Sequence, residues 1–101
     1  MNYCNRVSLE GVLAERQPVR YTPAGLPVTE AVILHQSEQN EAGQKRRVEC
    51  EAQMIALGQT AVELSRIETG ARLTVRGFLA AKSLRRRQEL VLHIEEFELL
   101  N

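Results

Sequence analysis

The sequence predicts an all-β protein of five strands, with one short helix between the third and the fourth. Three observations support this prediction. Five segments of the 101-residue chain have the length and apolar content of strands, and most of them alternate apolar with polar residues. One stretch between the third and fourth segments has helical spacing instead. Glycines interrupt the first and fourth segments, at Gly11 and Gly77, where a strand bends or another backbone comes close.

The first expected strand covers residues 6–13. Apolar side chains point to one face and mostly polar ones to the other, as in a half-buried strand. The apolar ones are Val7, Leu9 and Leu13. The next segment has turn residues, because Pro23 presets a negative φ and Gly25 allows a positive one. We therefore expect a turn at residues 22–26.

The second expected strand, residues 28–35, is apolar on both faces. Ala31 and Ile33 lie on one face, and Val32 and Leu34 lie on the other. A small barrel buries one face of a strand in its own core, so the other face needs a cover. A second copy of the chain is the simplest cover, and we expect a homodimer.

The middle of the chain holds a polar stretch, a strand and the helix. Residues 36–44 are polar and long enough to be a mobile loop. Residues 46–54 are the third expected strand, whose inward side chains are Val48, Cys50, Ala52 and Met54. Residues 59–66 are the expected helix, since Thr60 and Glu63 have the spacing of a capping box. Its apolar stripe consists of Ala61, Leu64 and Ile67.

The last two expected strands form a hairpin. Residues 72–79 are the fourth strand, whose inward side chains are Leu73, Val75 and Leu79. Residues 89–94 are the fifth, and Phe97 and Leu99 continue it. Residues 82–87 between them contain four cations, no acid and no glycine. We therefore expect a loop wider than the tight two-residue turn of a minimal hairpin.

This order of elements matches a five-stranded Greek-key barrel of the oligonucleotide- and oligosaccharide-binding (OB) type. Glycine in the first and fourth strands permits the sharp curl that so small a barrel needs. We expect residues 1–101 to form a single domain of this fold. OB folds usually bind oligonucleotides at their loops, especially between strands four and five. The basic residues 82–87 lie at that position.

The charge of the chain is segregated. The formal net charge is zero, which argues against a protein that is basic all over, but clustered cations still make a local field. The candidate phosphate-binding residues are Arg16, Arg20, Lys45, Arg46, Arg47, Lys82, Arg85, Arg86 and Arg87. The alternative is that these side chains are only solvated. Tyr21 is the candidate for base stacking, and a ring packed over the turn is the equally weighted alternative.

The side chains of common active sites are scarce. The chain has no Asp and two histidines, His35 and His93, both inside expected strands. It has neither the glycine-flanked serine of hydrolases nor a glycine loop for phosphate. Cys4 and Cys50 lack the spacing of a metal or redox site, and we expect both to be reduced. We therefore expect no enzyme, no metal and no cofactor.

The sequence also bears on location. No apolar run approaches the roughly 18 residues of a membrane helix. The first residues lack the apolar region of a signal peptide. We expect a cytoplasmic protein without a membrane partner.

Two stretches of the chain carry a family likeness. Residues 20–25 read RYTPAG, and with the flanking prolines they resemble the first hairpin of bacterial single-stranded DNA-binding proteins. Residues 91–100 read VLHIEEFELL. Together with residues 72–78 and the compact length, this ending is similar to the primosomal replication protein N (PriB) family within that superfamily. The likeness covers nearly the whole chain.

The resemblance implies a homodimer of OB folds that works in replication restart without catalytic activity. Such proteins bind single-stranded DNA, the PriA helicase and other primosome proteins at stalled forks, and they stimulate unwinding. The chain departs from the family on the outward face of the third strand, where better-known members offer an aromatic residue. The side chains there are Arg47, Glu49, Glu51 and Gln53, and the chain has no Trp. We therefore expect weak, mainly electrostatic DNA binding.

Three alternatives stay open at this point. The first is a protein–protein adaptor with negligible DNA affinity. The second is a general single-stranded DNA-binding protein, which is less expected because the chain stops at Asn101, directly after a strand and without an acidic tail. The third is an RNA-binding protein on the same fold.

Overall fold

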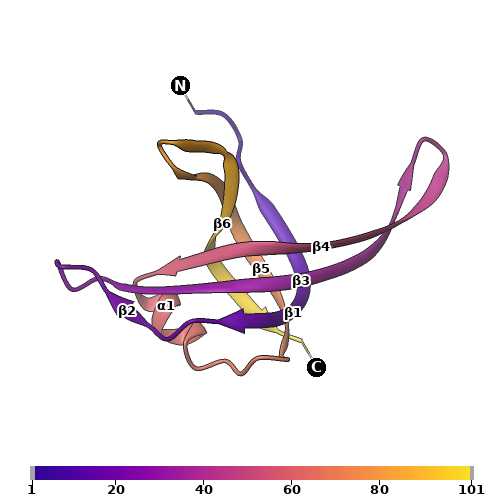
Figure 1. Ribbon diagram of the computed structural model, residues 1–101. Helices are drawn as coiled ribbons and strands as arrows, with labels where there is room; N and C mark the ends of the chain where they lie inside the picture. Colours follow the sequence, from indigo (N-terminus) through magenta and orange to yellow (C-terminus); the bar gives the residue numbers. More distant parts are fainter. Residues whose placement is uncertain (1, 101) are drawn as a thin grey trace.

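The computed structural model describes residues 2–100, and its strands form a closed barrel (Figure 1). The barrel strands are β1 (Val7–Arg16), β3 (Pro27–Glu41), β4 (Gln44–Leu57), β5 (Arg72–Ser83) and β6 (Arg86–Leu99). The helix α1 (Gln59–Leu64) lies between β4 and β5, as expected, and a two-residue strand that the sequence did not indicate, β2 (Arg20–Tyr21), precedes β3. The predicted OB barrel is therefore confirmed. No helix within the described range has the length and apolarity to cross a membrane.

The strands form one sheet in the order β1-β5-β6-β4-β3-β2, and a further β1–β3 pairing closes it. The β4–β6 pair is parallel, whereas the other pairs are antiparallel. The predicted turn is confirmed: the Thr22 N–H donates to the Leu26 carbonyl at 3.0 Å, and Gly25 has φ 87°. This turn brings β2 back against β3.

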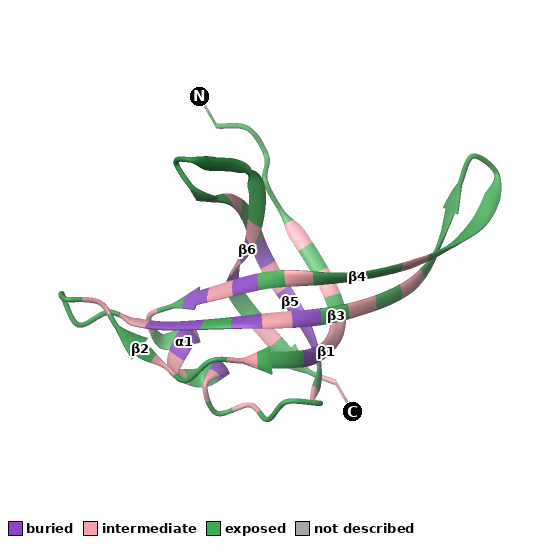
Figure 2. Ribbon diagram, in the orientation of Figure 1, coloured by how far each residue is buried: buried purple, intermediate pink, exposed green. Residues whose placement is uncertain are grey.

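One apolar core fills the barrel and continues under the helix (Figure 2). The buried side chains come from every barrel strand and include Leu13, Ile33, Met54, Leu73, Val75 and Leu92. Ala61 and Leu64 of α1 are fully buried against them, which confirms the predicted apolar stripe. The buried Thr29 hydroxyl donates to the Ala61 carbonyl at 2.8 Å and ties β3 to the helix.

The predicted capping box is wrong. The N-cap of α1 is Gly58, with φ 70° and no side-chain cap bond. The Thr60 hydroxyl lies inside the first turn and donates to the Glu95 carbonyl of β6 at 3.3 Å. The helix ends at Leu64, two residues before the predicted end at Arg66. Because the chain leaves β4 with a positive φ that favours glycine, Gly58 takes the position that the sequence pattern assigned to Thr60.

The predicted mobile loop at residues 36–44 is also wrong. β3 and β4 pair without interruption to Glu41 and Gln44, and they turn through Ala42 and Gly43 with φ 52° and 77°. Two positive φ values are typical of a type I′ turn, whose twist matches that of the paired strands. The polar residues therefore extend the hairpin as a two-stranded ribbon beyond the barrel (Figure 1). Two side chains predicted to point inward are exposed: Cys50 at the base of this ribbon, and Leu79 of β5, which is 38% exposed.

Both strand glycines permit a close approach of another backbone, as predicted. A Cβ atom added to Gly11 would lie 2.3 Å from the Leu34 carbonyl oxygen. A Cβ atom added to Gly77 would lie 1.7 Å from the His93 carbonyl oxygen. The β5–β6 register shifts next to Gly77, so that Glu95 falls between two regular pairs. Glycine is therefore required at both positions, because a larger side chain would collide with the backbone of a neighbouring strand.

Candidate nucleic-acid interface

The hairpin of β5 and β6 projects from one end of the barrel (Figure 1). Its turn is at Leu84 and Arg85, so the predicted wide loop over residues 82–87 is wrong. Ser83 pairs directly with Arg86, and the Ser83 hydroxyl accepts the Arg86 backbone N–H at 3.2 Å. A register shift between Ala81 and Ser83 accommodates a tight turn without glycine.

Most cations of this hairpin tip have no carboxylate partner. Arg86 forms an ion pair with Glu89, with the nitrogen and oxygen 3.4 Å apart. Lys82, Arg85 and Arg87 form no ion pair within residues 2–100, and all three are exposed. The tip therefore presents three unpaired positive charges to solvent, a suitable electrostatic partner for phosphates.

The second basic cluster has a different environment. Lys45, Arg46 and Arg47 lie at the end of the β3–β4 ribbon, where glutamates of the same ribbon neutralise them. The ion pairs, with separations of 3.5, 2.7 and 2.8 Å, are Lys45–Glu38, Arg46–Glu41 and Arg47–Glu49. Any phosphate that binds here has to compete with a carboxylate already in place. This cluster is therefore weaker than its sequence indicates.

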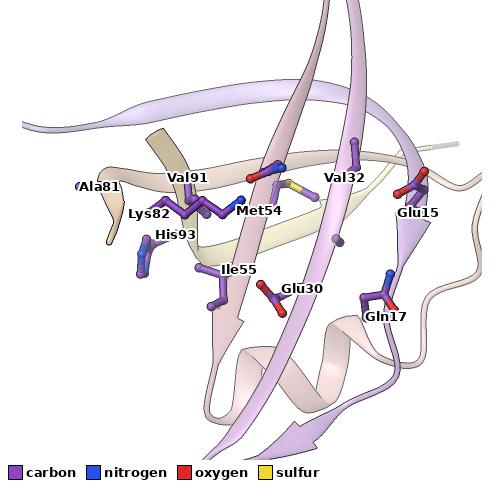
Figure 3. Close-up of a pocket in the computed structure, with 12 residues that line it drawn as sticks. Glu15, Gln17, Glu30, Val32, Met54, Ile55, Ala81, Lys82, Val91 and His93 are labelled. Atoms are coloured by element: carbon purple, nitrogen blue, oxygen red, sulfur yellow. The ribbon is translucent and has the colours of Figure 1, made fainter. Parts of the chain in front are cut away.

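A groove of about 570 Å³ crosses the outer face of β3, β4 and β6 (Figure 3). This is the face on which OB folds bind oligonucleotides. Apolar side chains on it are Val32, Ile55 and Val91. Lys82 borders the groove beside the hairpin, whereas Glu15 and Glu30 border it on the side of β1 and β3 (Figure 3). The lining is thus cationic at one end and anionic at the other.

Comparisons with known proteins agree with this architecture. The model of a family described as "another single-strand binding protein family" matches residues 5–96. Replication restart protein PriB of Nitrosomonas europaea is 38% identical over 96 residues, 95% of this chain and 88% of the relative. PriB of Neisseria gonorrhoeae is 42% identical over 85 residues, 84% of each chain. The chain belongs to the PriB family of replication restart proteins.

Solved structures extend the comparison to the fold. PriB of Ralstonia solanacearum has a TM-score of 0.87 and 35% sequence identity, over 98% of this chain and all of that one. The single-stranded DNA-binding protein of Thermus aquaticus has a TM-score of 0.78 and 29% identity, over 97% of this chain and 50% of that one. This PriB-family chain therefore shares its barrel with single-stranded DNA-binding proteins.

The PriB-family chain has an aromatic pair that its sequence did not reveal. The rings of Phe78 on β5 and His93 on β6 stack with centroids 4.9 Å apart and planes 14° apart. His93 is thus a packed histidine, and it borders the groove (Figure 3). The signal that could have found the pair is cross-strand register, which places Phe78 opposite His93 only because of the shift beside Gly77.

The remaining candidate residues lie near β2. Arg20 forms an ion pair with Glu30 at 3.4 Å, and Tyr21 is 62% exposed. The Arg16 guanidinium is half-buried, and its Nε donates to the Ile67 carbonyl at 2.8 Å. The Arg16 side chain therefore forms a hydrogen bond within the fold, whether or not it also contacts DNA. Tyr21 leaves most of its ring open for stacking.

Proposed function

We propose that this protein is a non-catalytic adaptor of replication restart that binds single-stranded DNA weakly and mainly through charge. The observation that carries the proposal is the trio of unpaired cations on the β5–β6 hairpin of an OB barrel, Lys82, Arg85 and Arg87. Relatives named for replication restart and for single-strand binding support it. In this proposal residues 1–101 act as one cytoplasmic OB domain.

Weak binding follows from the composition of the groove. Single-strand binders on this fold stack bases on aromatic side chains, each contributing roughly 1–3 kcal/mol. The floor offers Val32, Ile55 and Val91 instead, and the carboxylate of Glu15 repels phosphates. Charge at the hairpin tip therefore supplies most of the affinity, with Tyr21 as the candidate for stacking.

A salt titration with oligothymidine tests this proposal. Because each phosphate contact contributes about 0.7 to the slope of log K against log salt concentration, three contacts predict a slope near −2. Fluorescence anisotropy at several salt concentrations measures it, and an RNA oligonucleotide of the same sequence is the competitor. A slope near zero, or no binding at low salt, would refute the DNA-binding function.

We also propose that the protein contacts the PriA helicase and other primosome proteins at stalled forks and stimulates unwinding. The carboxylate of Glu15 in the groove favours a second candidate function, a protein–protein adaptor with negligible DNA affinity. The same titration separates the two when it is repeated with PriA. Capture of PriA without any measurable DNA binding favours the second function.

We further propose that the functional unit is a homodimer. On the outer face of β3, outside the groove, Leu34 is 39% exposed, so apolar surface is left open on this strand. Light scattering at micromolar protein concentration should return twice the monomer mass of 11.4 kDa. A monomer mass at that concentration contradicts the dimer.

A further inference from the structure

The most exposed large apolar side chain within residues 2–100 is at the tip of the β5–β6 hairpin. Leu84 is 94% exposed, and it occupies the first position of the two-residue turn. Turns of this kind favour glycine, asparagine, aspartate, serine and proline, each for a conformational reason. Leucine offers no such advantage and buries nothing here, so the fold by itself does not account for its presence.

The β5–β6 hairpin carries its turn away from the body of the barrel (Figure 1). Ser83 and Arg86 pair across the turn, and the Ser83 hydroxyl accepts the Arg86 N–H at 3.2 Å. The tip is therefore a paired structure up to its last residues. A side chain on such a tip can be pressed against a partner with little loss of backbone entropy.

Unpaired cations flank this leucine on both strands of the hairpin. Lys82 precedes the turn, Arg85 is its second residue and Arg87 follows it. None of the three has a carboxylate partner in the described part of the chain. An exposed leucine beside unpaired cations is complementary to a polyanion that also exposes an apolar surface. A DNA junction is such a partner, because its last base pair presents an unstacked face between two diverging phosphate backbones.

We propose that Leu84 is a wedge that packs against the terminal base pair where duplex DNA meets single strands. Aliphatic side chains insert at base steps in many DNA-binding proteins. Lys82 would contact the phosphates of one strand, and Arg85 and Arg87 those of the other. An isolated single strand has no paired end, so Leu84 confers a preference for forks. This inference rests on the proposed DNA-binding function and adds the kind of DNA that the tip recognises.

Fluorescence anisotropy with three DNA probes tests the wedge. The probes are oligothymidine, a blunt duplex, and a fork that joins the same duplex to oligothymidine arms. The expected affinity for the fork exceeds that for either simple probe by about 5- to 20-fold, as the partial burial of one leucine allows. Leu84→Ser should reduce this preference to about 2-fold or less and leave oligothymidine affinity unchanged, whereas Leu84→Phe should retain it.

Leu99→Ser is the matched control, since Leu99 is 55% exposed near the other end of β6. It should keep the fork preference. A 2-aminopurine at the last base pair should brighten when the wild type binds and stay dim with Leu84→Ser. The wedge is refuted if the wild type binds the fork and oligothymidine with equal affinity. It is also refuted if Leu84→Ser keeps the fork preference, which is the result expected if Leu84 binds a pocket of a partner protein instead of DNA. Those outcomes leave the proposed function intact, whereas loss of all DNA binding by the wild type refutes that function first.

Discussion

Gly77→Ala should lower the melting temperature of this protein much more than the same replacement of a glycine in an open turn. The added Cβ would lie 1.7 Å from the His93 carbonyl oxygen and 3.2 Å from the Glu95 amide nitrogen. These are backbone atoms of the neighbouring strand, so no side chain can rotate away. We expect a loss of about 3 kcal/mol or more, which lowers the melting temperature by roughly 12–24 °C.

Gly25→Ala is the matched control. Gly25 has φ 87°, but an added Cβ would meet nothing within 4 Å. It should therefore lose only the conformational term of about 1–2 kcal/mol. Circular dichroism melts of both variants measure the difference. A Gly77→Ala variant that melts within a few degrees of Gly25→Ala would show that β5 and β6 separate without cost at this point.

A second readout follows the aromatic pair. If the register beside Gly77 changes, Phe78 leaves its position over His93, and the ring-current shift of the imidazole protons disappears from the NMR spectrum. This readout distinguishes a local change of register from a general loss of stability. Gly25→Ala should leave the imidazole shift unchanged.

Removal of the three unpaired cations should weaken single-stranded DNA binding more than removal of the three paired ones. The hairpin variant replaces Lys82, Arg85 and Arg87 with Ala. At about 0.7 per contact, its slope of log K against log salt should be shallower by about 2, with roughly 100-fold weaker binding at about 0.1 M salt. Fluorescence anisotropy across a salt series measures both quantities.

The ribbon variant replaces Lys45, Arg46 and Arg47 with Ala and removes the same formal charge. Each of these cations already has a glutamate within 3.5 Å, so few counterions of DNA are released on their account. We expect the slope to change by less than about 0.7. All six side chains are exposed, so both variants should melt like the wild type. Equal slope changes in the two variants would contradict the assignment of DNA contact to the hairpin.

The amino-acid sequence by itself determined the class of the fold. Alternating apolar residues depend only on the period of a strand, and they placed Leu13, Met54 and Val75 in the core. Gly11 and Gly77 marked the two close approaches, because an L side chain there would collide with a neighbouring strand. The turn around Gly25 was equally predictable, since its chemistry is local.

The pairing of polar strand segments, and of the opposite charges on them, was not visible in the sequence. Residues 36–44 read as a loop because ribbon strands that lie outside a core need no apolar alternation. Lys45, Arg46 and Arg47 read as a basic cluster, although the β3–β4 hairpin places Glu38 beside Lys45 and Glu41 beside Arg46. Arg47 pairs with Glu49 on its own strand. The number of cations in the sequence therefore overestimates the free positive charge of this site. The arrangement of the folded strands decides which cations stay unpaired.

The basic hairpin shows the same division. Its charge, its position after the fourth strand and its place in an OB barrel follow from the sequence. The tight turn that exposes Leu84, and the stack of Phe78 on His93, follow only from the structure. With the register of the Arg76–Glu96 pair, Phe78 would lie opposite Ile94, but the shift at Glu95 places it opposite His93. A one-residue shift depends on how a strand closes the barrel, and no local sequence pattern encodes that closure.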